Sequence, residues 1–526
     1  MRLPAVANHL ACTAYLLALT PSVTVAAEEA SALFDTHGYD AAVRSAMDNW
    51  PQPGAGIAIV QSGEIIMLEG YGVLSTKTGE PVDGDSVFGI ASVSKGFAAA
   101  TIAKLVEMGK LDWDDPVVKH LLWFAMPNPA DTPRVTLRDL LSMRTGISSA
   151  EHTFRRASLD RADHVWRLRF NKQVHPLRSE YLYTTDTYTV IGQIVAETTG
   201  LAWEEFAEDH FWNPLDMTRT NADHVEAREL TNAASPHISV DQSSKMPVIW
   251  AYEDYNAVPA GGINSTPRDL ARWLIFQMSD GANLLSQESL DAMRELNTPF
   301  RSRYDSNIFQ PVTGRGPDGI TLGGHALGWQ THDYRGVQVV FHPGGIDGFK
   351  AMIGYVPELE FGAVVLLNAD DYELAVALFQ TAVDFRLGLG DQNKWSDRWR
   401  QYEQNREASL AQARLALEGA RRPGTTPSLD LFAYQGTYSD LGAFGRSTIK
   451  ASGDTLVLSS GRMTYDLAHW HHDVFRATPR WPYETERSKF FVYFRVDEYG
   501  DVTGFRLSIG DASFNRTRTH SSQGAE

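Results

Sequence analysis

At 526 residues the chain is too long for one small hydrophobic core, so we expect two folded domains. Hydrophobic residues make up 43% of it and charged residues 21%, which are the proportions of a soluble globular protein. The net charge of −18, with no basic cluster, argues against a surface that binds nucleic acid or an anionic membrane.

The first residues have the pattern of a secretory signal peptide. Arg2 is the only early charge, an apolar run follows through Ala14–Leu19, and small residues end the segment at Val25–Ala27. A buried helix is the alternative, but Pro21 fits it poorly. We therefore predict a signal peptide over residues 1–27 and an exported protein, periplasmic or secreted.

The only cysteine, Cys12, lies inside this segment. A mature chain without it has no thiol, which excludes disulfides, thiolate metal sites and cysteine nucleophiles. No later apolar run reaches the roughly 18–20 residues that a membrane span needs, so we expect none.

The next part of the chain has strands at both of its ends and helices between them. Two strands joined by a tight turn at Ser62–Gly63 are expected within 56–72, and the pattern from 85 to about 290 is mostly helical. Strands return at 338–341 and 362–368. This order predicts one α+β domain whose sheet is assembled from both ends of the segment.

The tetrad Ser92-Val93-Ser94-Lys95 lies where an apolar strand gives way to an Ala-rich helix. Residues three apart share a helix face, which brings the Lys95 amine close to the Ser92 hydroxyl. A serine hydroxyl becomes a nucleophile when a neighbouring base takes its proton, and a desolvated lysine can be that base. The alternative is a serine that caps the helix beside a solvated lysine.

A chain of this length holds about one or two Ser-x-x-Lys matches by chance, and a second match is present at Ser447–Lys450. That match lies in an alternating, strand-like stretch, where positions three apart point to opposite faces. We therefore expect no cooperation between Ser447 and Lys450.

Two later segments could complete an acyl-transfer site. In the first, a polar loop carrying Tyr183 runs into an apolar helix that ends at Gly200. A tyrosine beside a lysine can shuttle a proton, although plain packing is the alternative for Tyr183. In the second, a strand leads into His342 and then into glycines, where the backbone can approach a ligand closely and offer an N–H to an oxyanion.

Residues 392–420 form a charged helical stretch, and 421–428 has the composition of a linker. From Leu429 the sequence turns into short alternating strands separated by turn residues, which predicts a separate all-β module. The expected strands lie at 455–458, 490–495 and 503–508.

Taken in order, these motifs resemble those of the penicillin-recognising serine hydrolases, in the branch of class C β-lactamases and D-aminopeptidases. The family order of Ser-x-x-Lys, Tyr-x-Asn (or Ser) and Lys-Thr-Gly or His-x-Gly is matched by Ser92–Lys95, Tyr183–Thr185 and His342–Gly344. The resemblance covers about residues 40–385, and further stretches that match are Thr136–Ile147, Ala260–Leu270 and Gly348–Pro357.

The resemblance implies a β-lactamase/transpeptidase-like α+β domain, an antiparallel sheet flanked by helices, over residues 28–390. A helical connector and linker over 391–428 and a lipocalin-like β-barrel over 429–520 would follow. It implies that Ser92, Lys95 and Tyr183 are catalytic, with no metal and no organic cofactor. It also implies that the substrate and the oxyanion are held by a further set of residues, namely Thr185, His342, Gly344 and Gly345.

Two departures from the family pattern bear on the substrate. His342 stands where β-lactamases of this class carry lysine, and a mostly neutral imidazole binds a β-lactam carboxylate less well than an ammonium does. Thr185 replaces asparagine and so loses the amide that hydrogen-bonds a substrate amide. Both changes resemble the peptidase and esterase members.

We therefore expect a serine peptidase that cleaves short linear peptides, including ones with D- or non-proteinogenic residues such as linearised cyclic peptides. An esterase with the same site, a β-lactamase, and a non-catalytic protein that binds peptidoglycan or another ligand are the alternatives. A small peptide or ester is the expected partner, and the sequence leaves oligomerisation open. A metal site at the histidines of the tail is a further alternative to strand and turn there, and it would use His469, His471 and His472.

Overall fold

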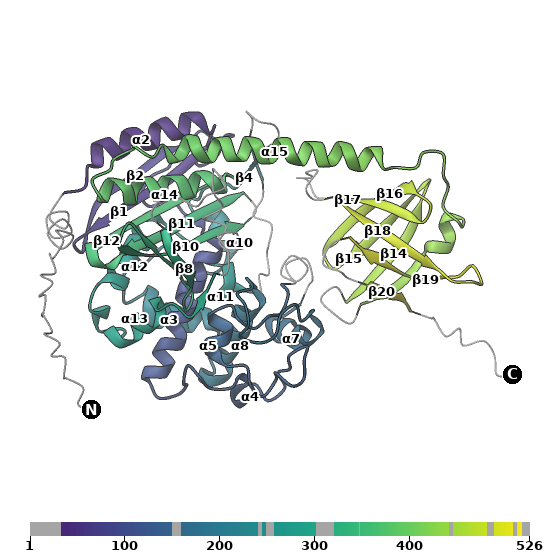
Figure 1. Ribbon diagram of the computed structural model, residues 1–526, viewed down its shortest axis with the longest axis horizontal. Helices are drawn as coiled ribbons and strands as arrows, with labels where there is room; N and C mark the ends of the chain where they lie inside the picture. Colours follow the sequence, from purple (N-terminus) through teal and green to yellow (C-terminus); the bar gives the residue numbers. More distant parts are fainter. Residues whose placement is uncertain are drawn as a thin grey trace, which may run out of the picture.

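The computed structural model describes residues 33–149, 159–239, 245–248, 257–300, 320–346, 348–440, 445–480, 489–508 and 513–517. The predicted signal peptide lies outside these residues. The expected architecture is confirmed: an antiparallel sheet flanked by helices is followed by a closed β-barrel (Figure 1). Among the described residues, no helix is long and apolar enough to cross a membrane.

The central sheet has eight strands in the order β2-β1-β12-β11-β10-β9-β8-β7. Both ends of the domain sequence contribute to it, because β1 pairs with β12 along its length. The apolar run of β12 is buried throughout, as expected of a central strand. The bounds of the strands are β1 Gly54–Gln61, β2 Glu64–Gly72, β7 Thr298–Pro299, β8 Ile320–His325, β9 Gln330–Tyr334, β10 Val337–Ile346, β11 Phe349–Val356 and β12 Phe361–Leu367.

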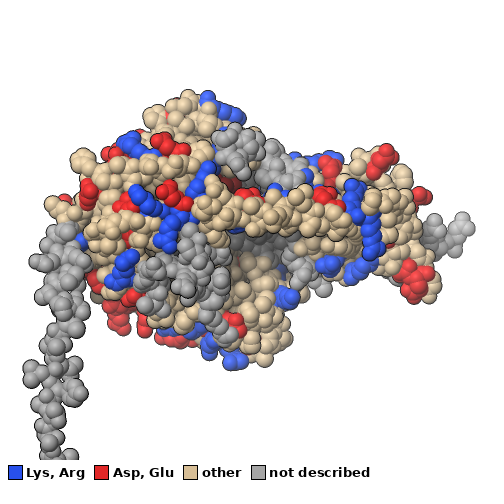
Figure 2. Space-filling model, turned by 45° about the horizontal axis from the view of Figure 1, so that its top comes forward, with Lys and Arg blue, Asp and Glu red and all other residues tan. Residues whose placement is uncertain are grey.

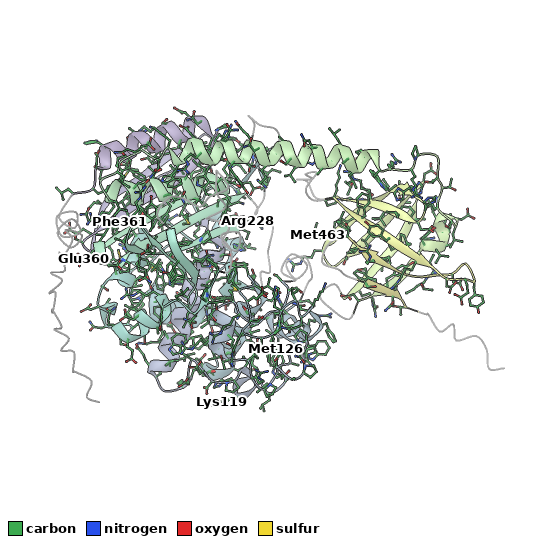
Figure 3. All side chains as sticks on the ribbon, viewed as in Figure 1. Lys119, Met126, Arg228, Glu360, Phe361 and Met463 are labelled. Carbon is green, nitrogen blue, oxygen red and sulfur yellow. The ribbon has the colours of Figure 1, made fainter. Side chains whose placement is uncertain are left out.

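One face of the sheet is covered by helices near the two ends of the domain. α2 (Thr36–Asn49), α14 (Tyr372–Arg386) and the first turns of α15 (Trp395–Gly419) bury a core with this face. Phe361, at the start of β12, stacks on Phe34 with ring centroids 5.4 Å apart, and Figure 3 labels its place at the edge of this layer.

The other face packs against the helical middle of the chain, and this is the side that carries the candidate site. Side chains fill the space between sheet and helices (Figure 3). The helices on this side are α3 Ser94–Glu107, α4 Val117–His120, α5 Leu137–Leu141, α7 Arg161–Arg167, α8 Asp186–Thr199, α9 Trp203–Ala207, α10 His224–Glu229, α11 Val258–Gly261, α12 Pro267–Met278 and α13 Gln287–Arg294. Two small ladders accompany them, β3 Phe88–Gly89 with β6 Asn264–Ser265, and β4 His237–Ser239 with β5 Lys245–Pro247.

The C-terminal module is a closed antiparallel barrel, consistent with the lipocalin-like prediction. Alternate residues of its strands point inward, and aromatic side chains such as Tyr438 and Phe505 fill the interior. Its strands are β13 Gly436–Ser439, β14 Arg446–Ser452, β15 Thr455–Ser460, β16 Met463–His471, β17 Val474–Pro479, β18 Phe490–Val496, β19 Val502–Leu507 and β20 Ser513–Arg516.

The long helix α15 runs from the sheet domain to the barrel (Figure 1). Near its end Glu418 pairs with Arg476 of β17 at 2.7 Å, and Arg421, two residues beyond the helix, donates to the Trp470 carbonyl at 3.0 Å. The face in Figure 2 carries basic and acidic side chains interspersed over α15 and its surroundings. The domain boundaries at 390 and 428 stay predictions, because α15 connects the two domains as one unbroken helix.

Candidate active site

Ser92 lies on a strained turn that precedes α3. Residues Ala91–Val93 form a 3-10 turn, and Ala91 has a φ of +49°, a conformation that costs a side-chain-bearing residue of the order of 1–3 kcal/mol. The strain is held by a short network: Ser94 Oγ donates to the Ala91 carbonyl at 2.7 Å and accepts from the Ile263 N–H at 3.2 Å. Ser92 is left partly exposed above a rigid backbone.

Lys95 is the second residue of α3 and has no exposed surface. Its ammonium donates to Ser92 Oγ at 3.0 Å and to the Ala260 carbonyl of α11 at 2.6 Å. It also lies 5.1 Å from the ring centroid of Tyr183 and 5.4 Å from that of Tyr188. A fully buried lysine is costly for stability, which is typical of a functional group.

Tyr183 approaches Ser92 from the loop before α8. Its hydroxyl donates to Ser92 Oγ at 2.8 Å, so one oxygen is bonded by both the amine and the phenol. The three side chains that the sequence singled out therefore meet at hydrogen-bonding distance. This is the arrangement that proton transfer to and from a nucleophile requires.

The loop of Tyr183 is braced from two sides. On one side, the Leu182 N–H donates to the Met143 carbonyl at 3.0 Å, and Tyr188 donates to the Leu141 carbonyl at 2.6 Å. On the other side, His164 Nε2 lies 3.0 Å from a carboxylate oxygen of Asp186, and both side chains are buried. We did not predict the Asp186–His164 pair from sequence, since 22 residues separate its members and α7 carries no motif.

The edge strand of the site is the second half of β10. A Cβ on Gly344 would lie 2.2 Å from the Ile90 carbonyl oxygen, so only glycine lets β10 pass this close to the turn that carries Ser92. Gly345, the predicted oxyanion donor, is partly exposed beside Lys350 of β11. That the Gly345 N–H donates to the oxyanion stays a prediction.

His342 is almost fully buried on β10, and its Nδ1 lies 2.7 Å from the Pro343 carbonyl. Burial lowers the pKa of His342 well below its usual value, and the charge of Lys95 lowers it further. The imidazole is therefore neutral at pH 7, in line with the sequence argument that it binds a β-lactam carboxylate less well than an ammonium does.

The structure adds a second buried histidine that sequence reasoning missed. His325 ends β8, has no exposed surface, and its ring centroid lies 6.1 Å from that of His342. Burial lowers the pKa of His325 to about 4, and Lys95 contributes in the same direction. The glycine-rich stretch around His325 was the available signal, because it resembles the stretch after His342.

Thr185 lies at the start of α8 and is 1% exposed. The Thr185 side chain is thus surrounded by other protein atoms. A contact of Thr185 with substrate stays a prediction. The second Ser-x-x-Lys match behaves as expected for a strand: Ser447 is buried in the barrel and donates to Ser460, whereas Lys450 is exposed.

Among the described residues, no group of three or more His, Cys, Asp or Glu side chains is arranged to hold a metal ion. His469 and His471 lie on β16, and His472 follows in the turn, where its carbonyl lies 2.9 Å from His469 Nε2. These three histidines therefore lie in a strand and in the turn that follows it.

Comparisons with known proteins identify the family of the chain and its fold. A family model described as Beta-lactamase matches residues 39–383, and one described as a domain of unknown function, DUF3471, matches residues 420–522. The chain belongs to the Beta-lactamase family, whose members are generally serine hydrolases, and the resemblance drawn from the motifs is confirmed.

Among its relatives, a protein named unguisins hydrolase ungD from Aspergillus violaceofuscus is 28% identical over 426 residues, which cover 76% of this chain and 74% of the relative. Protein flp from Staphylococcus aureus is 26% identical over 324 residues, covering 60% and 59% of the two chains.

Solved structures share the fold at lower identity. The octameric penicillin-binding protein homologue from Pyrococcus abyssi superposes with a TM-score of 0.59 at 20% identity, covering 91% of this chain and 99% of that one. The D-amino acid amidase from Ochrobactrum anthropi has a TM-score of 0.54 at 22% identity, with coverage of 67% and 98%.

Proposed function

We propose that this protein is a serine hydrolase that cleaves short linear peptides through an acyl-enzyme on Ser92. The observation that carries the proposal is the contact of Ser92 Oγ with both Lys95 Nζ at 3.0 Å and Tyr183 OH at 2.8 Å. A protein that only binds a ligand gains nothing from a buried lysine bonded to a serine on a strained turn, because both features cost stability.

In the proposed first step, Ser92 Oγ attacks the carbonyl carbon of the scissile bond while the Lys95–Tyr183 pair takes its proton. To act as a base, either the Lys95 amine or the Tyr183 phenol must first have lost a proton. The same proton then passes to the leaving nitrogen, for which the partly exposed Tyr183 hydroxyl is the better placed donor.

The backbone N–H groups of Ser92 and Gly345 are the proposed donors to the oxyanion that forms during attack. Water then attacks the ester on Ser92, the pair takes a proton from this water, and Ser92 leaves with its proton restored. His342, Gly344 and Thr185 would position the substrate and the strand beside it. Every step uses groups of this chain, and the proposal includes no cofactor.

Two lines support a peptide as substrate. The relative from Aspergillus violaceofuscus, which this chain matches over 74% of its length, is named for the hydrolysis of unguisins. In addition, the neutral His342 offers no fixed positive charge to a β-lactam carboxylate, which disfavours the β-lactamase alternative. An esterase would use the same three side chains, so it is separated from a peptidase by substrate alone.

The test is mass spectrometry of peptide mixtures with L- and D-residues after incubation with the wild type and with Ser92→Ala. We expect cleavage by the wild type that is absent with Ser92→Ala. Hydrolysis of esters but of no peptide would make the esterase the function. The absence of any Ser92-dependent cleavage by a folded protein would leave a binding protein.

A further inference from the structure

Two buried imidazoles beside the catalytic lysine are left with unused hydrogen-bond acceptors. In both His325 and His342 the Nδ1 atom lies 2.7 Å from a backbone carbonyl, which can only accept, so Nδ1 carries the proton. Nε2 of each ring is then a lone-pair acceptor. Within the described part of the chain neither Nε2 has a hydrogen-bond partner, and both atoms are buried.

The two rings form one unit near Lys95. They stand edge to face with centroids 6.1 Å apart. Gly328, in the turn after His325, lies against the backbone of Lys95, where a Cβ would come within 2.5 Å of the Lys95 carbonyl oxygen. The turn that follows His325 therefore packs directly on the start of the catalytic helix.

His325 also packs against a partly exposed aromatic ring. Tyr181 stacks on His325 at 5.8 Å and meets Phe300 edge to face at 4.7 Å, and both aromatic rings are partly exposed. Because His325 is buried, a substrate on Ser92 can reach it only if a neighbouring side chain moves, and we take the partly exposed Tyr181 to be that side chain.

The positive charge of Lys95 determines which kind of hydrogen-bond donor the two imidazoles can bind. Lys95 lies close enough to depress the pKa of both histidines, so its field also disfavours a second cation there. No carboxylate is among the groups that shift the pKa of either ring. An uncharged N–H satisfies a buried imidazole acceptor without adding charge.

We propose that His325 and His342 together bind neutral amide N–H groups of the substrate, so that the site prefers an acylated amino acid over one with a free ammonium beside the scissile bond. This inference rests on the proposed function and deepens it: the substrate would be cut within a chain or behind a blocked residue, and not next to a free N-terminus. His325 is thereby a specificity-determining residue.

The experiment uses three diphenyl phosphonate probes that share one side chain and react covalently with an active serine. The first carries an acetamido group on the α-carbon, the second a CH₂ in place of its N–H, and the third a free ammonium. The rate of Ser92 labelling is followed by intact mass for the wild type, His325→Leu and His325→Gln, with Ser92→Ala as blank.

We expect the wild type to react on the order of tenfold faster with the acetamido probe than with either of the other two. His325→Leu should lose most of that preference, and His325→Gln, whose amide oxygen can accept a hydrogen bond, should keep part of it. Equal rates for the acetamido and CH₂ probes, an unchanged preference in His325→Leu, or fastest reaction with the ammonium probe would overturn the inference.

His332→Leu is the matched control, because His332 is a buried histidine of the neighbouring strand β9 that packs on Phe341, on the opposite face of the sheet. It should keep the wild-type preference. If His325→Leu does not fold, the comparison of probes on the wild type still decides. Failure of a simple fluorophosphonate to label Ser92 would refute the proposed function itself, whereas labelling without discrimination refutes only this inference.

Discussion

The hydroxyl of Tyr183 lies 2.8 Å from Oγ of Ser92, although 91 residues separate them in the chain. The bond is made by a loop that α5 and the Asp186–His164 pair hold in place, so Tyr183 is positioned before any substrate arrives. Preorganisation of this kind is what a proton-transfer site needs.

Removing the phenol oxygen should therefore impair catalysis and leave the fold intact. We expect Tyr183→Phe to lower kcat/KM by about 10²–10⁴, the usual contribution of general acid–base groups. Tyr188→Phe is the matched control, since the Tyr188 hydroxyl meets backbone groups, donating to the Leu141 carbonyl and forming a hydrogen bond with the Gly328 backbone. Steady-state rates on one peptide measure both, and equal losses in the two variants would contradict the assignment.

Replacing the buried lysine should separate activity from stability. In Lys95→Met the bond to Ser92 Oγ is lost, and we expect activity to fall to the level of Ser92→Ala. The free energy of unfolding should stay level or rise by about 1 kcal/mol, because an apolar side chain replaces a buried charge. Denaturant titration measures it, and a loss above about 2 kcal/mol would show that Lys95 is structural.

The two glycines of β10 should respond differently to alanine. A Cβ on Gly344 meets the backbone oxygen of Ile90 at 2.2 Å, whereas one on Gly345 meets only the flexible side chain of Lys350 at 3.4 Å. Gly344→Ala should displace β10, lower the melting temperature and reduce Ser92 labelling at least tenfold. Gly345→Ala should keep most of the stability, and a similar melting temperature for both variants would contradict this account.

Stability should fall as the pH drops below about 6.5. An unfolded histidine binds a proton near pH 6.5, but folded His325 does so only near pH 4. Between these values the unfolded state holds more protons, so this contribution is fully present above pH 6.5 and is lost toward pH 4. For His325 it amounts to about 3 kcal/mol at most, and His342 acts in the same direction.

Melting temperatures of the wild type and His325→Leu between pH 4 and 8 measure this effect. The variant should show a shallower decline on acidification. An identical slope in the two proteins would mean that His325 is not held neutral by the fold.

The sequence alone predicted the α+β domain, the barrel and the central motif, for identifiable reasons. The strands around Ser62–Gly63, the helix after Ser92 and the helix that ends at Gly200 are encoded locally, by alternation, apolar spacing and glycine. These patterns need only neighbours along the chain, and each of them is confirmed as secondary structure.

The sequence could not predict which residues that lie far apart in the chain come into contact. The glycine-rich stretch around His325 resembles the one after His342, but the contact of the two rings depends on how β8 and β10 flank β9 in the sheet. The Asp186–His164 pair likewise depends on the packing of α7 on α8. The strain at Ala91 is also invisible in sequence, because alanine gives no signal for a positive φ.

The measurement that tests the central claim most directly is the mass of the folded protein after exposure to a fluorophosphonate, with the modified residue located by fragmentation. Our account predicts one adduct, on Ser92, that is absent in Ser92→Ala and slowed strongly in Lys95→Met. A folded wild type that gains no adduct, or one whose adduct persists in Ser92→Ala, would contradict it.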